Sequence, residues 1–229
     1  DIQVLSELCR ARDCLLVVDN CFMTPVLQKP LALGADLVIH SATKYLDGQG
    51  RVMGGAVLGR ADLIEPVTSF IRSGGVTMSP FNAFMFIQGL ETLSLRIREH
   101  SINAEKVAQF LSSHPAVEKV IYPSVQSGTA KERAEKYLKG GNGALMGVEL
   151  KGGVESGKKF IDSLELLYHV ANIGDSKSLA IHPASTTHSQ LSPEEQLAAG
   201  VTPGFVRLSI GIEHIDDIID DINQSLEQI

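Results

Sequence analysis

The sequence of 229 residues predicts an α/β protein made of two units. Three short apolar runs, over residues 15–19, 37–40 and 55–58, are separated by segments of helical or turn character. This alternation is typical of an α/β domain, and an apolar run bounded by polar residues indicates a buried strand of a parallel sheet. Two later strand-like runs accompany two helical patterns, which favours an α+β unit. We place the boundary between them so that residues 1–92 form the first unit and residues 93–229 the second.

The first unit opens with a helical pattern over residues 1–10 that leads into the first strand. The glycine-rich segment 47–55 fits neither of the common glycine motifs for phosphate, so we interpret it as a tight loop. Ser79-Pro80 then begins a long helical stretch with a bend allowed within it. His114-Pro115 ends the stretch, because proline cannot continue a helix. The unit boundary lies on this stretch.

In the second unit, residues 144–150 and 205–211 are expected to be strands, and residues near 154–168 and 214–228 helices. The last helix has the clearest pattern, because apolar residues recur at helical spacing opposite four aspartates, which we interpret as a solvated stripe. The apolar positions are Ile215, Ile218, Ile219, Ile222, Leu226 and Ile229, and the acidic ones are Asp216, Asp217, Asp220 and Asp221. Ser192 and Glu195 form the pattern of a capping box.

Composition excludes several kinds of protein. Hydrophobic residues make up 44% of the chain and charged residues 21%, which is ample for a buried core. The net charge of −7, without a basic cluster, argues against nucleic acid and anionic membranes as partners. No apolar run approaches the roughly 20 residues of a membrane span, and the first residues lack the features of a signal peptide. We therefore expect a soluble, cytoplasmic protein.

Cysteines and histidines do not indicate a metal site. Cys9, Cys14 and Cys21 are an odd number without a CxxC pair, which argues against a disulfide framework or a zinc site. Cys21 is better explained as a small buried thiol than as a nucleophile. His182 and His188 lie near three hydroxyl residues, but no third ligand stands at a recognisable spacing. We expect no metal.

Polar side chains gather where two predicted strands end. Asp19 ends the first strand, and Ser41, Thr43 and Lys44 follow the second. Ligands of parallel sheets bind at the carboxyl ends of the strands, so these side chains are expected to share one crevice. An amine that condenses with an aldehyde, an acid for a pyridinium nitrogen and two hydroxyl donors for a phosphate suit pyridoxal phosphate. The sequence therefore predicts a site for this cofactor.

Each of these residues also has a plainer interpretation. Taken alone, Lys44 would be a surface lysine, Asp19 would begin a turn, and Ser41 and Thr43 would be turn formers. Their combination favours the cofactor. Arg207 is a charged residue inside a strand of apolar or small residues, and its burial would be costly unless an anion meets it. That anion is either part of a substrate or an acidic side chain.

Three segments carry a resemblance to a known family. Val18–Asn20, Gly34–Asp36 and His40–Tyr45 are similar to the Cys/Met-metabolism family of pyridoxal-phosphate enzymes, and the similarity extends over essentially the whole chain. It implies a fold-type-I pyridoxal-phosphate transferase, with residues 1–92 as the C-terminal part of the large α/β cofactor domain and 93–229 as a smaller α+β domain. Members of the family are longer and form homotetramers, so the chain resembles the C-terminal portion of such an enzyme. The part beyond it would carry an aromatic residue that stacks on the cofactor.

The resemblance also assigns roles to residues. Those expected to bind the cofactor are Asp19, Ser41, Thr43 and Lys44, and Lys44 is expected to be catalytic as well. Arg207 would bind the α-carboxylate of an amino-acid substrate through its planar guanidinium. Asn172 lies in a loop that touches the same carboxylate, although many relatives carry serine there.

A narrower likeness concerns the substrate. Asp47–Gly55, Ser79–Ala83 and Gly89–Leu93 resemble family members that act on O-succinylhomoserine. The expected reaction replaces its γ-substituent with sulfide, giving homocysteine and succinate for methionine biosynthesis. Arg51 would then meet the distal carboxylate of the succinyl group, unless it forms a surface ion pair. Four alternatives stay open: an O-acetylhomoserine sulfhydrylase, a cystathionine γ-synthase, a γ-lyase, or a non-catalytic fragment or structural paralogue.

Overall fold

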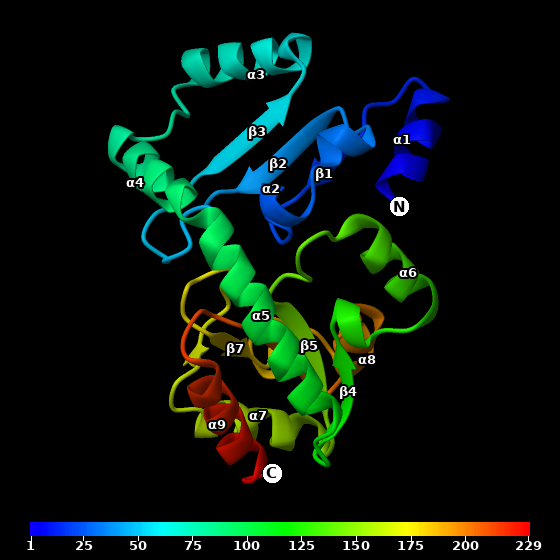
Figure 1. Cartoon of the computed structure of the whole chain (residues 1–229), viewed down its shortest axis with the longest axis vertical. Helices are drawn as coiled ribbons and strands as arrows, with labels where there is room; N and C mark the ends of the chain where they lie inside the picture. The colour runs from blue at the N-terminus through cyan, green and yellow to red at the C-terminus, as the bar shows by residue number, and fades with distance from the viewer.

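The structure, a computed structural model, describes all 229 residues and has two lobes joined by one long helix, α5 (Leu93–Ser112) (Figure 1). The first lobe precedes this helix. Its elements are α1 (Ile2–Arg10), β1 (Val17–Asp19), α2 (Thr24–Leu27), the 3-10 helix η1 (Pro30–Leu33), β2 (Leu37–Ser41), β3 (Gly55–Gly59), α3 (Ala61–Gly74) and α4 (Pro80–Glu91). The three predicted strands of this lobe are confirmed, and so is its first helix.

The sheet of the first lobe is small and mixed. Its order is β1-β2-β3, in which β1 runs parallel to β2 and β3 runs antiparallel to it. The prediction of buried strands holds for only one face of this sheet. Val38 and His40 on β2 are 3% and 5% exposed, whereas Leu15 is 53% exposed, Val17 47% and Ile39 40%.

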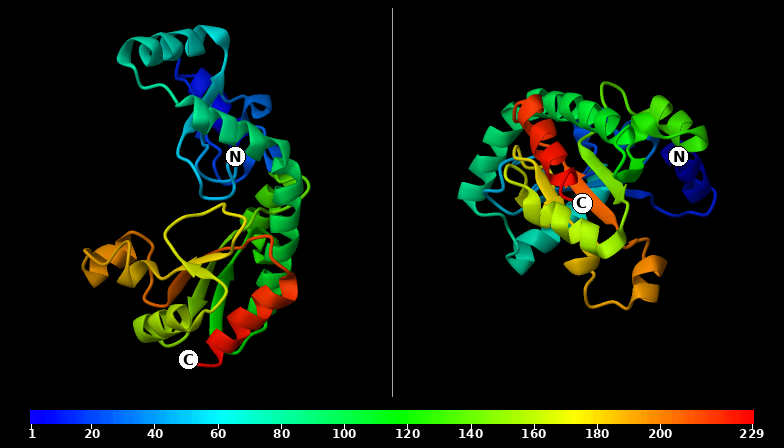
Figure 2. Two further views of the ribbon diagram at one scale, coloured as in Figure 1. Left: turned by 90° about the vertical axis from the view of Figure 1, so that its left-hand side faces the viewer. Right: turned by 90° about the horizontal axis from the view of Figure 1, so that it is seen from below.

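The second lobe surrounds a five-stranded sheet of order β4-β5-β8-β7-β6, in which only β6 and β7 pair in parallel. Its elements after α5 are β4 (Val117–Ile121), η2 (Pro123–Val125), α6 (Gly128–Tyr137), β5 (Leu145–Leu150), α7 (Gly153–Ser163), β6 (Tyr168–His169), β7 (Leu179–Ile181), η3 (Pro183–Ser185), α8 (Pro193–Ala198), β8 (Phe205–Ser209) and α9 (Ile215–Leu226). Helices α5 and α7 contact the sheet, and α9 packs against both helices (Figure 2).

The main hydrophobic core belongs to the second lobe. It contains 24 buried residues, among them Leu208 on β8 and Ile218 and Ile222 on α9. Only Leu27 and Tyr45 come from the first lobe, so the core reaches across the joint between the lobes. Tyr45 directly follows Lys44, and its burial therefore anchors the lysine loop to the second lobe.

Two predicted helices differ in their extent. The stretch from Ser79 is divided at Thr92, whose φ of −106° and ψ of 2° leave the helical region. The helix expected near 154–168 ends at Ser163, and Tyr168–His169 pairs as a short strand instead. The capping box is confirmed, with Ser192 accepting from the backbone N–H of Glu195. None of the helices combines the length and apolar character that a membrane crossing requires.

The acidic stripe on α9 is only partly solvated, which corrects the prediction. Asp221 is 7% exposed and its carboxylate accepts hydrogen bonds from three consecutive backbone N–H groups at residues 165–167. These bonds offset the desolvation of the charge, because buried polar groups are stable when they are paired. Asp221 therefore holds the segment between α7 and β6 onto α9.

Candidate active site

Lys44 lies where two consecutive turns meet after β2. One turn is closed by a backbone hydrogen bond from Lys44 N to Ser41 O (3.2 Å) and the next by one from Gly48 N to Lys44 O (2.8 Å). The Nζ atom of Lys44 donates to Oδ1 of Asn172 at 2.6 Å. Asn172 belongs to the loop between β6 and β7, so this bond joins the two lobes at the lysine amine.

Arg207 approaches the same loop from the strand β8. Its Nη2 donates to the backbone oxygen of Asn172 at 3.2 Å. The side chain is half-buried, burial lowers the pKa of its guanidinium, and no acidic side chain forms an ion pair with it. The alternative of an internal ion pair is therefore not found. Lys44, Asn172 and Arg207 thus form one group in which the guanidinium can still accept an anionic ligand.

Asp19 ends β1 with its carboxylate held by Cys21. Hydrogen bonds from the side chain and from the backbone N–H of Cys21 lower the pKa of Asp19, and the backbone bond measures 2.9 Å. The Sγ atom of Cys21 also accepts from Ser41 N at 2.7 Å, so this thiol connects the ends of β1 and β2. Burial raises the pKa of the Cys21 thiol, which agrees with the predicted small buried thiol. An ionised Asp19 suits a protonated ring nitrogen.

The two hydroxyl groups before Lys44 differ. The Ser41 hydroxyl makes no hydrogen bond within the chain, whereas Oγ1 of Thr43 donates to Gly54 O at 3.3 Å and accepts from Gly54 N at 3.1 Å. Thr43 therefore holds the glycine-rich loop against β2. Of the two hydroxyl groups, only that of Ser41 has a proton without an acceptor in the chain, which leaves it free to donate.

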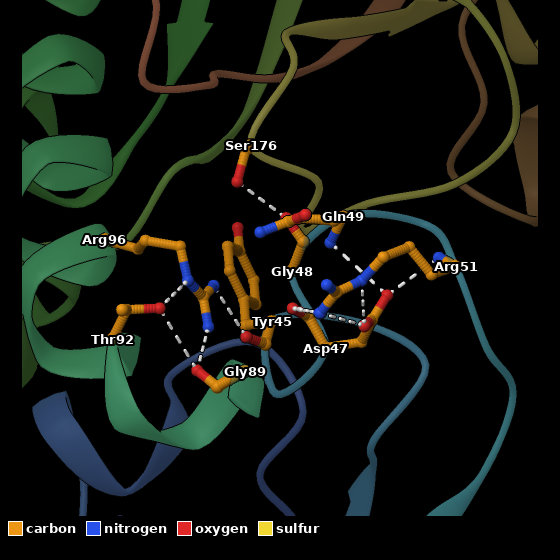
Figure 3. A network of polar contacts seen from close by, with 9 residues as sticks. All are labelled: Tyr45, Asp47, Gly48, Gln49, Arg51, Gly89, Thr92, Arg96 and Ser176. Carbon is orange, nitrogen blue, oxygen red and sulfur yellow. Dashed lines mark hydrogen bonds and ion pairs between the residues drawn. The ribbon is translucent and has the colours of Figure 1, made fainter. Parts of the chain in front are cut away.

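Arg51 forms an ion pair, which was the alternative interpretation of this residue. Its Nε and Nη2 lie 2.9 and 2.8 Å from Oδ1 of Asp47, and its backbone N donates to Oδ2 at 2.8 Å (Figure 3). Asp47 is fully buried, while the side chain of Arg51 is 30% exposed. Gly48 and Gly50 adopt positive φ angles of 70° and 63°, which favour glycine, so the loop is tight as predicted.

The histidine-rich segment has structural contacts. The buried ring of His182 bonds Oγ of Ser185 and the carbonyl of Pro203, each at 2.8 Å. No three His, Cys, Asp or Glu side chains come together in a way that could hold a metal ion. This segment therefore stabilises the loop after β7.

The arrangement defines a class of protein. A lysine amine and an ionised acid at neighbouring strand ends suit pyridoxal phosphate, and a half-buried arginine suits the carboxylate of an amino acid. A model of the family described as Cys/Met metabolism PLP-dependent enzyme matches residues 1–227. The chain belongs to this family, whose members use pyridoxal phosphate.

Curated relatives with different activities match almost equally well. O-succinylhomoserine sulfhydrylase of Pseudomonas aeruginosa is 45% identical over 226 residues, which cover 99% of this chain and 56% of that protein. O-acetyl-L-homoserine sulfhydrylase of Leptospira meyeri is 44% identical over 270 residues, covering 100% of this chain and 61% of that protein. The chain thus spans little more than half the length of these relatives.

A solved structure gives the same fold. A putative O-acetylhomoserine (thiol)-lyase from Campylobacter jejuni, which contains a pyridoxyl-lysine monophosphate, superposes with a TM-score of 0.92 at 38% identity. The match covers 99% of this chain and 62% of that one. The predicted fold-type-I architecture of a pyridoxal-phosphate enzyme is therefore confirmed.

Proposed function

We propose that the protein containing this chain converts O-succinylhomoserine and sulfide into homocysteine and succinate. The observation that carries the proposal is the group formed by Lys44, Asn172 and Arg207. A guanidinium without an acidic partner near the lysine amine suits a substrate with an α-carboxylate next to the carbon that loses a proton.

The chain's own residues supply binding and proton transfer. Arg207 would hold the α-carboxylate through two parallel N–H bonds, which orients Cα toward Lys44. Asp19 would keep the ring nitrogen of the cofactor protonated, and Ser41 would donate to its phosphate. The bound cofactor supplies a place for the electron pair left at Cα. Lys44 would take the Cα proton, release it so that its amine is neutral again, and then take a Cβ proton as succinate leaves Cγ. After sulfide adds to Cγ, the protons would return to Cβ and Cα by the reverse transfers.

The succinyl group requires a cation at the far end of the site. Two nitrogens of Arg51 are bonded to Asp47, and its Nη1 has no partner within the chain. That nitrogen could bind the distal carboxylate without breaking the ion pair. The acetyl ester lacks this carboxylate. Sequence identity to the O-succinylhomoserine and O-acetylhomoserine sulfhydrylases, 45% and 44%, favours neither ester, so an experiment must distinguish them.

The test compares kcat/KM for the succinyl and acetyl esters with sulfide, in the native enzyme and in Arg51→Gln. We expect the native enzyme to prefer the succinyl ester and Arg51→Gln to reduce that preference. Arg60→Gln is the matched control, because Arg60 pairs with Asp36 and Asp62 on the surface. A native preference for the acetyl ester would refute the proposed substrate. Efficient release of a thiol from methionine would instead indicate a γ-lyase.

The proposal also includes a cytoplasmic homotetramer. The proposed activity requires a covalently bound cofactor, which a non-catalytic paralogue would not need. Borohydride reduction should therefore fix the cofactor to Lys44, and peptide mass analysis should locate it there. Sedimentation of the native protein measures the oligomer directly. Absence of any label would favour a structural paralogue.

A further inference from the structure

Arg96, in the first turn of α5, is a buried cation without an ion pair. It is 6% exposed, and burial lowers the pKa of its guanidinium. Its Nη1 donates to Tyr45 O at 2.8 Å, its Nη2 to Gly89 O at 2.7 Å and its Nε to Thr92 Oγ1 at 3.2 Å (Figure 3). Burial of a charge is costly, and these bonds offset that cost only while the acceptors stay in place. The acceptors are the end of α4 and the residue that follows Lys44.

Two glycines allow this close contact. A Cβ atom on Gly48 would lie 2.0 Å from Nη1 of Arg96, and a Cβ atom on Gly89 would lie 2.2 Å from Leu46 O. The guanidinium is thus enclosed between the lysine loop and the end of α4. Ser176, in the loop that also contains Asn172, reinforces the contact, because its backbone N and hydroxyl both donate to Gly48 O at 2.7 Å.

The same face of α5 also holds the strand that carries Arg207. One turn after Arg96, Nδ1 of His100 bonds Ile210 O at 2.6 Å, and its ring packs edge-on against Tyr45 at 5.4 Å. Asn103 then donates to Gly211 O at 3.2 Å. Residues three and four apart lie on one face of a helix, so one rigid element contacts both the loop of Lys44 and the end of β8.

We infer that Arg96 is a positioning residue that fixes Lys44 at its working distance from Arg207. The inference rests on the proposed function, because it assigns to Lys44 the proton transfer described above. Arg96 would act through the lysine loop, because its guanidinium bonds the backbone oxygen of Tyr45 and lies directly against Gly48. Its loss would let the lysine loop shift while Arg207 keeps its own support.

A residue that only positions Lys44 should affect kcat much more than KM. In the native enzyme, Arg96→Ala should lower kcat roughly 10- to 100-fold, because a displacement of about 1 Å costs that much in proton transfer. KM should stay within about three-fold, because Arg207 is untouched. Guanidinium ion added to Arg96→Ala should restore part of kcat by filling the vacated site. The fraction of protein labelled at Lys44 after a brief borohydride pulse should fall in parallel, which gives a readout independent of turnover.

Leu111→Ala is the matched control, since Leu111 is a core residue on the same helix, 1% exposed, and touches neither loop. It should lower Tm but leave kcat unchanged and insensitive to guanidinium. Arg96→Lys retains the charge and should give an intermediate kcat, which keeps the test valid if the alanine variant fails to fold. The inference would be overturned if Arg96→Lys kept the native kcat. It would also be overturned if Arg96→Ala lost no more kcat than Leu111→Ala at equal Tm. Failure to label Lys44 in the unmodified enzyme would refute the proposed function itself.

Discussion

The two lobes differ in the size of their buried cores and in the site residues that they carry. The second lobe is built around a core of 24 buried residues, whereas the separate core of the first lobe has three, Ala42, Leu46 and Phe86. Yet the first lobe carries Lys44 and Asp19. The residues expected to do the chemistry therefore lie in the lobe with little core of its own, and their positions depend on contacts with the second.

The exposed surface of the first lobe leads to the same conclusion. Phe70 is 69% exposed, Phe81 66% and Phe84 56%, all on the helices α3 and α4. No other element of the chain covers these rings. The stability of the first lobe is therefore expected to vary with whatever covers it, while that of the second is expected to be intrinsic.

The largest expected effect separates chemistry from stability. Lys44→Ala in the native enzyme should lower turnover at least about 1,000-fold, because no other group replaces the amine as proton acceptor. Covalent cofactor should disappear after borohydride reduction, while Tm of the cofactor-free protein should fall only slightly, because a single partly buried hydrogen bond to Asn172 is lost. Cofactor still attached to the variant protein would show that another lysine holds it.

Truncation of one side chain in each lobe tests whether the lobes contribute unequally to the free energy of unfolding. Leu208→Ala should lower the free energy of unfolding by about 2–5 kcal/mol, because Leu208 is 1% exposed. Val57→Ala in β3 should lower it by less than about 1 kcal/mol, since Val57 is 39% exposed. Urea denaturation measures both. Equal losses in the two variants would contradict the comparison.

The free energy of unfolding should depend on pH through His100, which lies at the joint between the lobes. Burial lowers the pKa of His100 from 6.5 to about 4, with Arg96 adding to the shift and the Ile210 carbonyl opposing it. The folded state holds neutral His100, so its contribution to stability is complete above pH 6.5 and is lost as pH falls toward 4. Between pH 7.5 and 5 the loss should be about 2 kcal/mol. The difference between the native protein and His100→Gln, measured by urea denaturation at both pH values, isolates it. An identical pH dependence in both proteins would contradict this assignment.

The smallest expected effect concerns the second lobe's contribution to the site. Arg207→Lys keeps the charge but loses the planar pair of N–H donors, so KM for the amino-acid substrate should rise roughly ten-fold. The absorption spectrum of the bound cofactor should not change, because Arg207 is expected to contact only the substrate. An unchanged KM would remove its role in carboxylate binding.

Local patterns in the sequence were sufficient for much of the fold. The alternation of apolar runs predicted β1, β2 and β3, and the isoleucine spacing predicted α9. Short elements with weak patterns, such as β4, α6 and β7, were not predicted. The exposure of Leu15, Val17 and Ile39 was also missed, because an apolar run reports the preference of a strand for burial and not whether anything covers it.

The sequence by itself determined which residue types are available for the cofactor, since Asp19 and Ser41 end neighbouring parallel strands and Lys44 follows the second one. Only the tertiary structure brought Asn172 to Lys44 across 128 positions, paired Arg51 with Asp47, buried Asp221 and enclosed Arg96 between two glycines. Local periodicity reflects the geometry of a single helix or strand. Contacts between distant residues depend instead on how the lobes pack, because burial and hydrogen-bond partners exist only once the backbone has been arranged in space.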